Sequence, residues 1–130
     1  QERARAAVAE WQAEHGTVDR DLLAFLRDVR AAGLPVGIAT NGTDALPAAL
    51  DALALTAEVD VVVNSSVVGV HKPAKEFFVA ACQALQLPPS LVFFIDADDR
   101  AVRGARAAGL SALRWSGPDD LRYVRAALDL

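Results

Sequence analysis

Apolar and polar residues follow two alternating patterns along this chain, and the patterns predict strands and helices in turn. Three short segments are rich in apolar residues and contain valine, isoleucine or phenylalanine, as strands buried on both faces do, and a fourth, shorter segment contains alanine, leucine and tryptophan. Between them, apolar residues recur every three or four positions, as on one face of an amphipathic helix. Such alternation predicts an α/β fold, a three-layer sandwich with a parallel sheet between helices. The expected strands are PVGIAT (35–40), VDVVVNSS (59–66), LVFFI (91–95) and SALRW (111–115).

The beginning of the chain has a different pattern and is predicted to be helical. Within residues 2–14, the apolar positions have helical spacing. We therefore expect residues 1–16 to be separate from an α/β core that is formed by residues 17–130. The helix that leads into the first expected strand should begin near Asp19, a suitable N-cap, and end at Gly33. The apolar positions of the first segment are Ala4, Ala7, Val8 and Trp11.

Composition narrows the classes of partner. The net charge is -4 and no basic stretch stands out, which argues against nucleic acid as a partner. The longest apolar runs are too short to span a bilayer, so no membrane association is expected. The single cysteine, Cys82, can form no internal disulfide and fits a reducing cytoplasm. The composition thus predicts a cytoplasmic globular protein.

Residues able to bind a phosphoryl group and a cation occur where the expected strands stop. In an open parallel sheet, ligands bind outside the carboxyl ends of the strands. Hydroxyl and backbone N–H groups and one ammonium can hold anionic oxygens there, while carboxylates can hold Mg²⁺. The candidate residues are Thr40, Asn41 and Gly42 after the first strand, Lys72 in the loop after the second, and Asp96, Asp98 and Asp99 at the end of the third.

Each of these residues also has a simpler explanation. Thr40 could cap the turn that follows it, and Lys72 could be an ordinary solvated lysine. Asp98 and Asp99 could cap the next helix and interact favourably with its dipole. Asp96 is harder to explain in this way, because it directly follows five apolar residues and should be partly buried.

Three segments, in this order, resemble the motifs of the haloacid dehalogenase-like (HAD) hydrolase superfamily from about residue 19 to the end of the chain. GLPVGIATNG (33–42) is similar to its second motif, with Thr40 as the hydroxyl residue. VVNSSVVGVHKPAKEFF (62–78) is similar to its third, with Lys72 before a proline. FFIDADDRAVRGARAAGL (93–110) is similar to its fourth. The resemblance implies a HAD-like, Rossmannoid core.

The resemblance also implies roles for these residues. Thr40 would donate its hydroxyl to an oxygen of the transferred group, assisted by the backbone at Asn41 and Gly42. Lys72 would steady the nucleophile and the phosphoryl charge, and Asp96 would hold Mg²⁺. Asp98 and Asp99 are the acids that could complete the metal site. The expected substrate is a small phosphorylated molecule.

Two departures from the family pattern are evident. The nucleophile of the family is the first aspartate of a DxD motif after an apolar strand near the N-terminus, and no such motif occurs here. The second of two adjacent acids in the fourth motif is replaced by Ala97. Residues 1–16 instead resemble the end of a helical cap, so we expect the central strand of the sheet to be missing. An upstream segment or another chain would fill the gap, or the neighbouring strands would close on each other.

Two functions remain open from the sequence. The chain is either part of a HAD-like hydrolase, best described as a magnesium-dependent phosphatase that is inactive as this isolated chain, or a non-catalytic HAD-like module for binding or assembly. A response-regulator receiver domain also carries acids, a threonine and a lysine at strand ends. In a receiver domain the acids come first and the lysine last, whereas here the order is Thr40, Lys72, Asp96.

Overall fold

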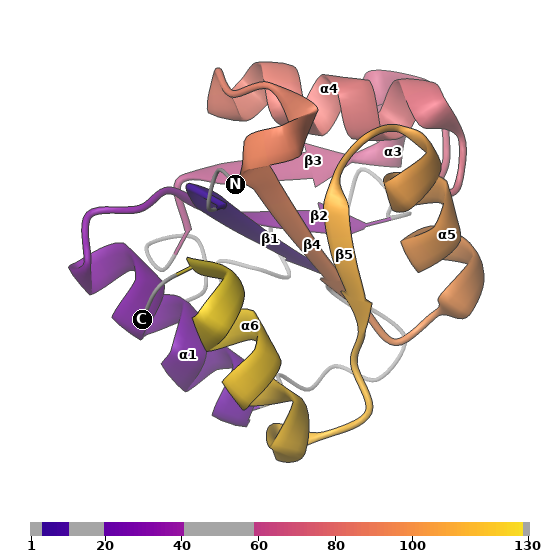
Figure 1. Cartoon of the computed structure of the whole chain (residues 1–130). Coiled ribbons are helices and arrows are strands. Elements are labelled where there is room, and N and C mark those ends of the chain that lie inside the picture. Colours follow the sequence, from indigo (N-terminus) through magenta and orange to yellow (C-terminus); the bar gives the residue numbers. More distant parts are fainter. Residues whose placement is uncertain (1–3, 11–19, 41–58, 129–130) are drawn as a thin grey trace.

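The computed structural model describes residues 4–10, 20–40 and 59–128, and these residues form an α/β sandwich. All five strands of the sheet are parallel, in the order β3-β2-β1-β4-β5 (Figure 1). The predicted fold class is confirmed, and so are the four strands expected from the sequence, although the second ends at Asn64 because a helix begins at Ser65. The strands are β1 (Ala6–Glu10), β2 (Val36–Thr40), β3 (Val61–Asn64), β4 (Val92–Asp96) and β5 (Ser111–Arg114).

The central strand, β1, corrects our prediction for the start of the chain. Ala7 pairs with Val36 of β2 on one side and with Phe93 of β4 on the other. The predicted helix over residues 2–14 and the missing central strand are therefore both wrong, since residues 6–10 fill the place between the two strands. Neither a second chain nor closure of β2 onto β4 is needed.

Burial explains why this alanine-rich segment is a strand. Alanine has the highest intrinsic helix propensity, and the spacing of the apolar residues also fits a helix. However, residues 6–9 are all buried, on both faces of the sheet. A strand covered on both sides needs apolar residues at consecutive positions, and the small alanine side chains fit between two neighbouring strands and two helical layers. Tertiary packing thus overrides local propensity here.

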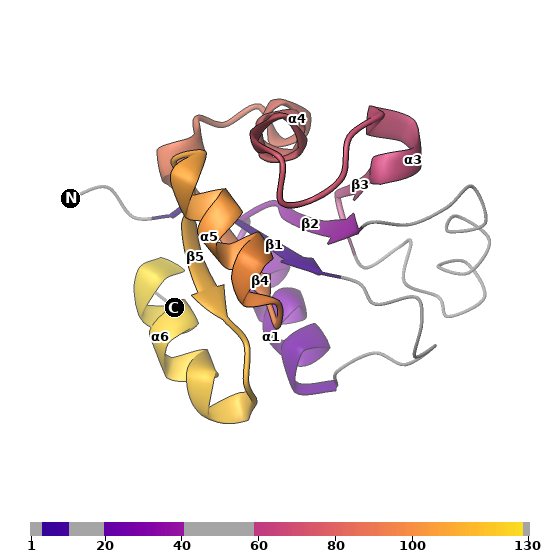
Figure 2. The same cartoon turned by 90° about the vertical axis from the view of Figure 1, so that its right-hand side faces the viewer.

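Helices cover both faces of the sheet (Figures 1 and 2). On one face lie α1 (Arg20–Ala31) and α6 (Leu121–Leu128). On the other lie α4 (Lys75–Leu85) and α5 (Asp99–Ala107), next to the short helix α3 (Ser65–Val68). The sequence also predicts a helix that is capped by Thr43 and extends to Leu53, and this segment lies outside the described residues. Two 3-10 turns, η3 (Pro89–Leu91) and η4 (Pro118–Asp120), precede β4 and α6.

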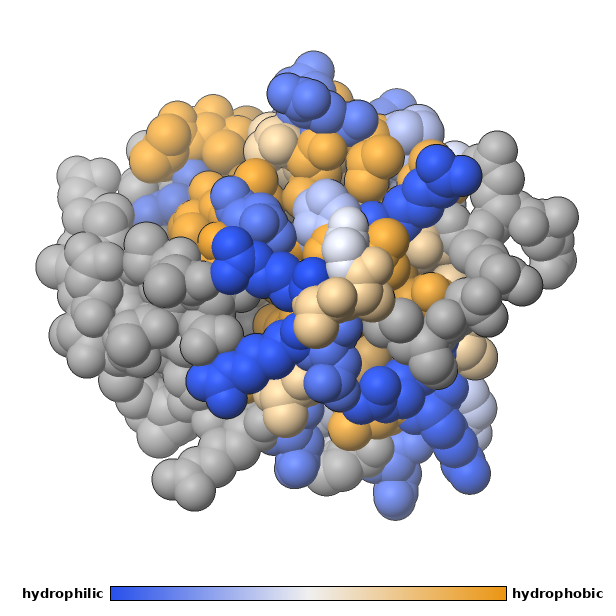
Figure 3. Space-filling view, turned by 90° about the vertical axis from the view of Figure 1, so that its left-hand side faces the viewer, coloured by the Kyte–Doolittle hydropathy of each residue, from blue (hydrophilic) through white to orange (hydrophobic). Residues whose placement is uncertain are grey.

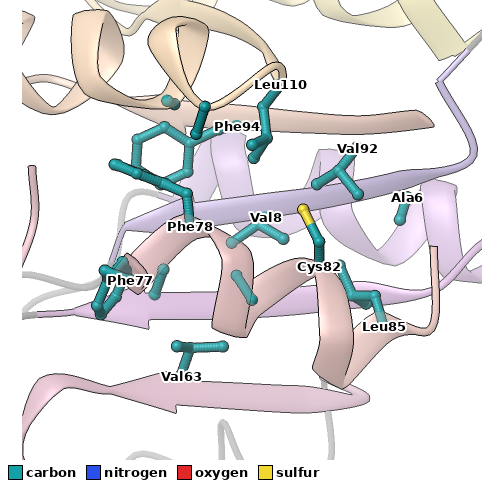
Figure 4. Close-up of a cluster of buried hydrophobic side chains, with 14 of the residues drawn as sticks. Ala6, Val8, Val63, Phe77, Phe78, Cys82, Leu85, Val92, Phe94 and Leu110 are labelled. Carbon is teal, nitrogen blue, oxygen red and sulfur yellow. The ribbon is translucent and has the colours of Figure 1, made fainter. Parts of the chain in front are cut away.

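Two apolar clusters, one on each face, fix the helices to the sheet. Beneath α4 and α5, the ring of Phe78 meets that of Phe94 edge-on, with centroids 5.1 Å apart (Figure 4). On the opposite face, Phe25 and Val29 of α1 are completely buried against the sheet. These clusters hold the ends of the strands in fixed positions.

No helix among the described residues is both long and apolar enough to cross a bilayer. On the side opposite to that seen in Figure 2, hydrophilic and hydrophobic residues are interspersed (Figure 3).

Candidate functional site

Three strands of the sheet have a polar residue as their last residue, at the carboxyl edge of the sheet. Thr40 is the last residue of β2 and pairs with Asn64, the last residue of β3. Asp96 is the last residue of β4. All three side chains are buried, although they are polar. Buried polar groups are costly unless they are held by hydrogen bonds, so their concentration at the ligand-binding edge of a parallel sheet indicates a site.

Lys72 connects the two strands that flank β1. Its Nζ donates to Oδ2 of Asp96 at 3.1 Å and to the backbone O of Ala39 at 3.4 Å. Because Ala39 belongs to β2 and Asp96 to β4, the ammonium lies over the carboxyl end of β1, the strand between them. Thr40, Lys72 and Asp96 therefore converge at one edge of the sheet, as predicted from their positions at the carboxyl ends of parallel strands. The alternative in which Lys72 is a solvated loop lysine is wrong, because only 4% of its side chain is exposed.

The segment that carries Lys72 is packed tightly against α5. A Cβ atom on Gly104 of α5 would come within 2.6 Å of the carbonyl oxygen of Pro73 and 2.8 Å of its Cβ. Glycine is therefore required for this close approach of helix and loop. The Nζ of Lys72 also lies 5.8 Å from the centre of the Phe94 ring, within the range of a cation–π contact. The lysine is thus held by the fold.

Asp96 is the buried acid of the site, and its two oxygens have different partners. Oδ2 accepts from Lys72, whereas Oδ1 accepts from the backbone N of Asp98 at 2.8 Å. Its side chain has no exposed surface. Of the acids predicted to bind metal, Asp96 is the one placed inside the site.

The two other predicted metal ligands, Asp98 and Asp99, lie at the start of α5 and interact with residues of that helix. Asp98 is the N-cap of this helix, and its carboxylate accepts from the backbone N of Arg100 at 2.9 Å. Asp99 is exposed and pairs with Arg103 at 3.1 Å. The alternative that Asp98 caps the helix is therefore confirmed. Among the described residues, no three acids, histidines or cysteines lie close enough together to form a metal site by themselves.

The sequence analysis missed Glu10, the last residue of the central strand. Its register partner in β2 is Ala39, so its backbone lies at the carboxyl edge, between the strands that carry Thr40 and Asp96. The sequence from this point reads Glu10, Trp11, Gln12, where a DxD motif was expected. The signal was the apolar run AAVA followed by an acid, which is as consistent with a fully buried strand as with a helix.

The remaining predicted residues, Asn41 and Gly42, lie outside the described part of the chain. Two polar residues at the end of β3 join the site instead. Asn64 and Ser65 are buried beside Thr40 and the start of α3. Among the side chains that the structure describes, the edge therefore offers hydroxyl and amide groups, one ammonium and one buried carboxylate. This set suits an oxyanion that is bound by hydrogen bonds and by the charge of Lys72.

Comparison with known proteins identifies the same family as the motifs. A sequence model of the haloacid dehalogenase-like hydrolases matches residues 2–109. Phosphatase MT3486 of Mycobacterium tuberculosis (strain CDC 1551 / Oshkosh) is 36% identical over 89 residues, which cover 67% of this chain and 41% of that protein. (S)-2-haloacid dehalogenase 1 of Pseudomonas sp. (strain CBS-3) is 30% identical over 95 residues, which cover 72% of this chain and 42% of that protein.

Among solved structures, an uncharacterized protein from Corynebacterium glutamicum has a similar fold. The TM-score is 0.82 at 26% sequence identity, and the similarity covers 97% of this chain and 96% of the other. The chain spans about two fifths of the length of the curated relatives that it matches. Since the family match begins at residue 2, it includes the central strand β1.

Proposed function

Because the chain belongs to the haloacid dehalogenase-like hydrolase family, we propose that it is a phosphatase-type domain that binds a small phosphorylated molecule where Thr40, Lys72 and Asp96 meet. The observation that carries the proposal is the position of the Lys72 ammonium. It lies over the end of the central strand, between β2 and β4. An anion that enters at this strand end would meet the lysine, with the Thr40 side chain beside it.

We also infer that this chain alone does not turn the ligand over. The acid at the end of β1 is a glutamate. Its side chain is one methylene longer than that of aspartate, about 1.5 Å, and a misplacement of about 1 Å can cost a hundredfold in rate. Gln12 replaces the second acid of the DxD motif and can neither give nor take a proton as a carboxylate does. A phosphatase-type domain that binds its ligand without turning it over therefore fits this chain.

Magnesium fits the site only in part. Mg²⁺ is usually held by one or two carboxylates together with waters and substrate phosphates. Asp96 is the buried carboxylate at this edge, and Asp98 and Asp99 are engaged at the start of α5. We propose that Asp96 holds the ion together with oxygens of the ligand. The bound ion would neutralise phosphoryl charge.

A turnover assay tests this proposal. The purified chain should release no product from p-nitrophenyl phosphate or from 2-chloropropionate, with or without Mg²⁺, beyond the level of a Lys72→Met variant. Methylphosphonate, a phosphate-like anion, should nevertheless raise its melting temperature. Turnover by the unchanged chain that disappears in Lys72→Met would show that a catalytic group is present. If methylphosphonate did not change the melting temperature, the proposal that the chain binds a phosphate-like anion would be wrong.

Restoring the motif provides a second, positive test. In the double variant Glu10→Asp/Gln12→Asp, a DxD motif follows the central strand. We expect this variant to hydrolyse p-nitrophenyl phosphate at a rate that depends on Lys72. Its matched control is Glu14→Asp, which makes the same type of change outside the motif. A double variant that binds methylphosphonate but stays inactive would count against Glu10 as the residue in the nucleophile's place.

A further inference from the structure

Arg114 ends β5 at the same edge of the sheet as the candidate site. Its register partner in β4 is Asp96, so the two residues lie side by side on neighbouring strands, which are about 5 Å apart. The backbone remains paired just beyond this point, since the N of Trp115 donates to the O of Asp96 at 2.8 Å. The base of the Arg114 side chain is therefore fixed next to Asp96.

The guanidinium of Arg114 is exposed and oriented by one backbone contact. Its Nε donates to the carbonyl O of Ala97 at 3.3 Å. Ala97 directly follows Asp96, so the guanidinium lies across the start of the loop between β4 and α5. Within the described part of the chain, this is the one hydrogen bond that the structure gives to the Arg114 side chain. The two terminal nitrogens can then form the paired hydrogen bonds that suit a carboxylate or phosphate.

Two other exposed arginines in this region differ from Arg114 in their contacts. Arg103 pairs with Asp99 along α5. Arg106 donates both Nε and Nη2 to the O of Ala112, at 3.3 and 2.8 Å. Neither of them belongs to a strand end. Arg114 therefore combines a position beside Asp96 with an exposed guanidinium that forms no ion pair with any of the described residues.

The charge of the site also calls for a further cation. The positive charge of Lys72 is offset by Asp96, which lies 3.1 Å away in the buried pair. A phosphoryl group brings about two negative charges at neutral pH. A ligand with a second anionic group brings still more charge, and Arg114 is the exposed cation in register with the site.

We propose that Arg114 binds a second anionic group, such as a carboxylate, of the ligand whose phosphoryl group lies at Lys72. This inference rests on the proposed function, since it assigns a substrate class to the same site. The ligand is then a phosphorylated compound with another anionic group a few atoms away. Arg114 determines specificity and takes no part in bond breaking.

Three phosphonates with the same first anion test the inference. Methylphosphonate has no second anion, whereas phosphonoacetate and 3-phosphonopropionate add a carboxylate at two distances. Their dissociation constants would be measured by calorimetry for the unchanged chain and for Arg114→Ala. The matched control is Arg5→Ala, which removes the same charge from an exposed residue before β1, at the opposite edge of the sheet. Far-UV circular dichroism checks that each variant is folded.

We expect Arg114→Ala to raise the dissociation constant of phosphonoacetate, of 3-phosphonopropionate or of both by about tenfold. This is the size of the contribution of one charge-assisted hydrogen-bond pair at an exposed site. The dissociation constant of methylphosphonate should change less than twofold in Arg114→Ala. Arg5→Ala should have the same effect on the dissociation constants of all three ligands. If Arg114→Ala weakens all three phosphonates equally, or none, the inference is wrong while anion binding stands. If the unchanged chain binds none of them, the proposed function fails and the inference fails with it.

Discussion

The ammonium of Lys72 and the carboxylate of Asp96 are 3.1 Å apart, with side-chain exposures of 4% and 0%. Removing charges from water costs several kcal/mol for each ion, and their mutual attraction offsets this cost only when the geometry is good. Here Ala39 O and Asp98 N provide the additional hydrogen bonds. The sequence predicted Lys72 and Asp96 as two separate candidate residues of the site. Their direct contact was not predicted, since 24 positions separate them in the sequence.

The pair predicts a specific pattern of stability. Lys72→Met leaves the Asp96 carboxylate buried without its cation and should lower the free energy of unfolding by about 3–5 kcal/mol. The double variant Lys72→Met/Asp96→Asn removes both charges and should be more stable than this single variant. Urea unfolding followed by circular dichroism measures both. A Lys72→Met variant as stable as the unchanged chain would show that the pair is not buried as described.

Cys82 allows a prediction that depends on pH. It is buried in the cluster beneath α4, and burial raises the pKa of its thiol above the ordinary value. The folded chain therefore keeps the thiol protonated to higher pH than the unfolded chain does. At pH 9, iodoacetamide should label Cys82 much more slowly in the folded chain than in urea, because the thiolate is the reactive form. Equal rates would contradict both the burial and the raised pKa.

At the scale of elements, the sequence predicted strands 35–40, 59–66, 91–95 and 111–115 and failed at β1. The four strands contain β-branched or aromatic residues and stop at turn or polar residues. In β1, alanine at three of five positions imitates a helix, and its strand conformation depends on neighbours that come later in the chain. The failure had a functional consequence, because Glu10 was hidden within the predicted helix.

The packing of α5 on the Lys72 segment is also an element-scale feature. Glycine inside a helix normally costs about 1 kcal/mol relative to alanine, so Gly104→Ala would stabilise an isolated helix. Here the new Cβ would lie 2.6 Å from the Pro73 carbonyl oxygen, which is backbone and cannot turn aside. We expect Gly104→Ala to destabilise the chain by about 1–3 kcal/mol and to weaken binding of methylphosphonate.

Thermal unfolding and calorimetry measure the two effects of Gly104→Ala. Arg100→Ala is the control, since it places alanine at an exposed position of the same helix. Arg100→Ala should leave stability nearly unchanged. A Gly104→Ala variant that is more stable than the unchanged chain would mean that helix and loop are less closely packed.

At the scale of the whole molecule, alternating strands and helices were sufficient to predict the layers and the ligand-binding edge. In a parallel sheet all strands end on the same side. Lys72 can therefore contact both Asp96, which is 24 positions away in the sequence, and Ala39, which is 33 positions away. The roles of Asp98 and Asp99 were not fixed by the sequence, since an acid before a helix can bind a cation or cap the helix equally well. The structure shows Asp98 as a cap.

The central claim is that the edge formed by Thr40, Lys72 and Asp96 binds an anion. It is tested most directly by ¹H–¹⁵N NMR spectra of the labelled chain during a titration with methylphosphonate. The account predicts that the largest shifts occur for the backbone amides of Glu10, Thr40, Lys72 and Asp98, and that they disappear in Lys72→Met. Shifts that gather at the opposite edge, around Arg5 and Leu91, or no shifts at millimolar ligand, would contradict it.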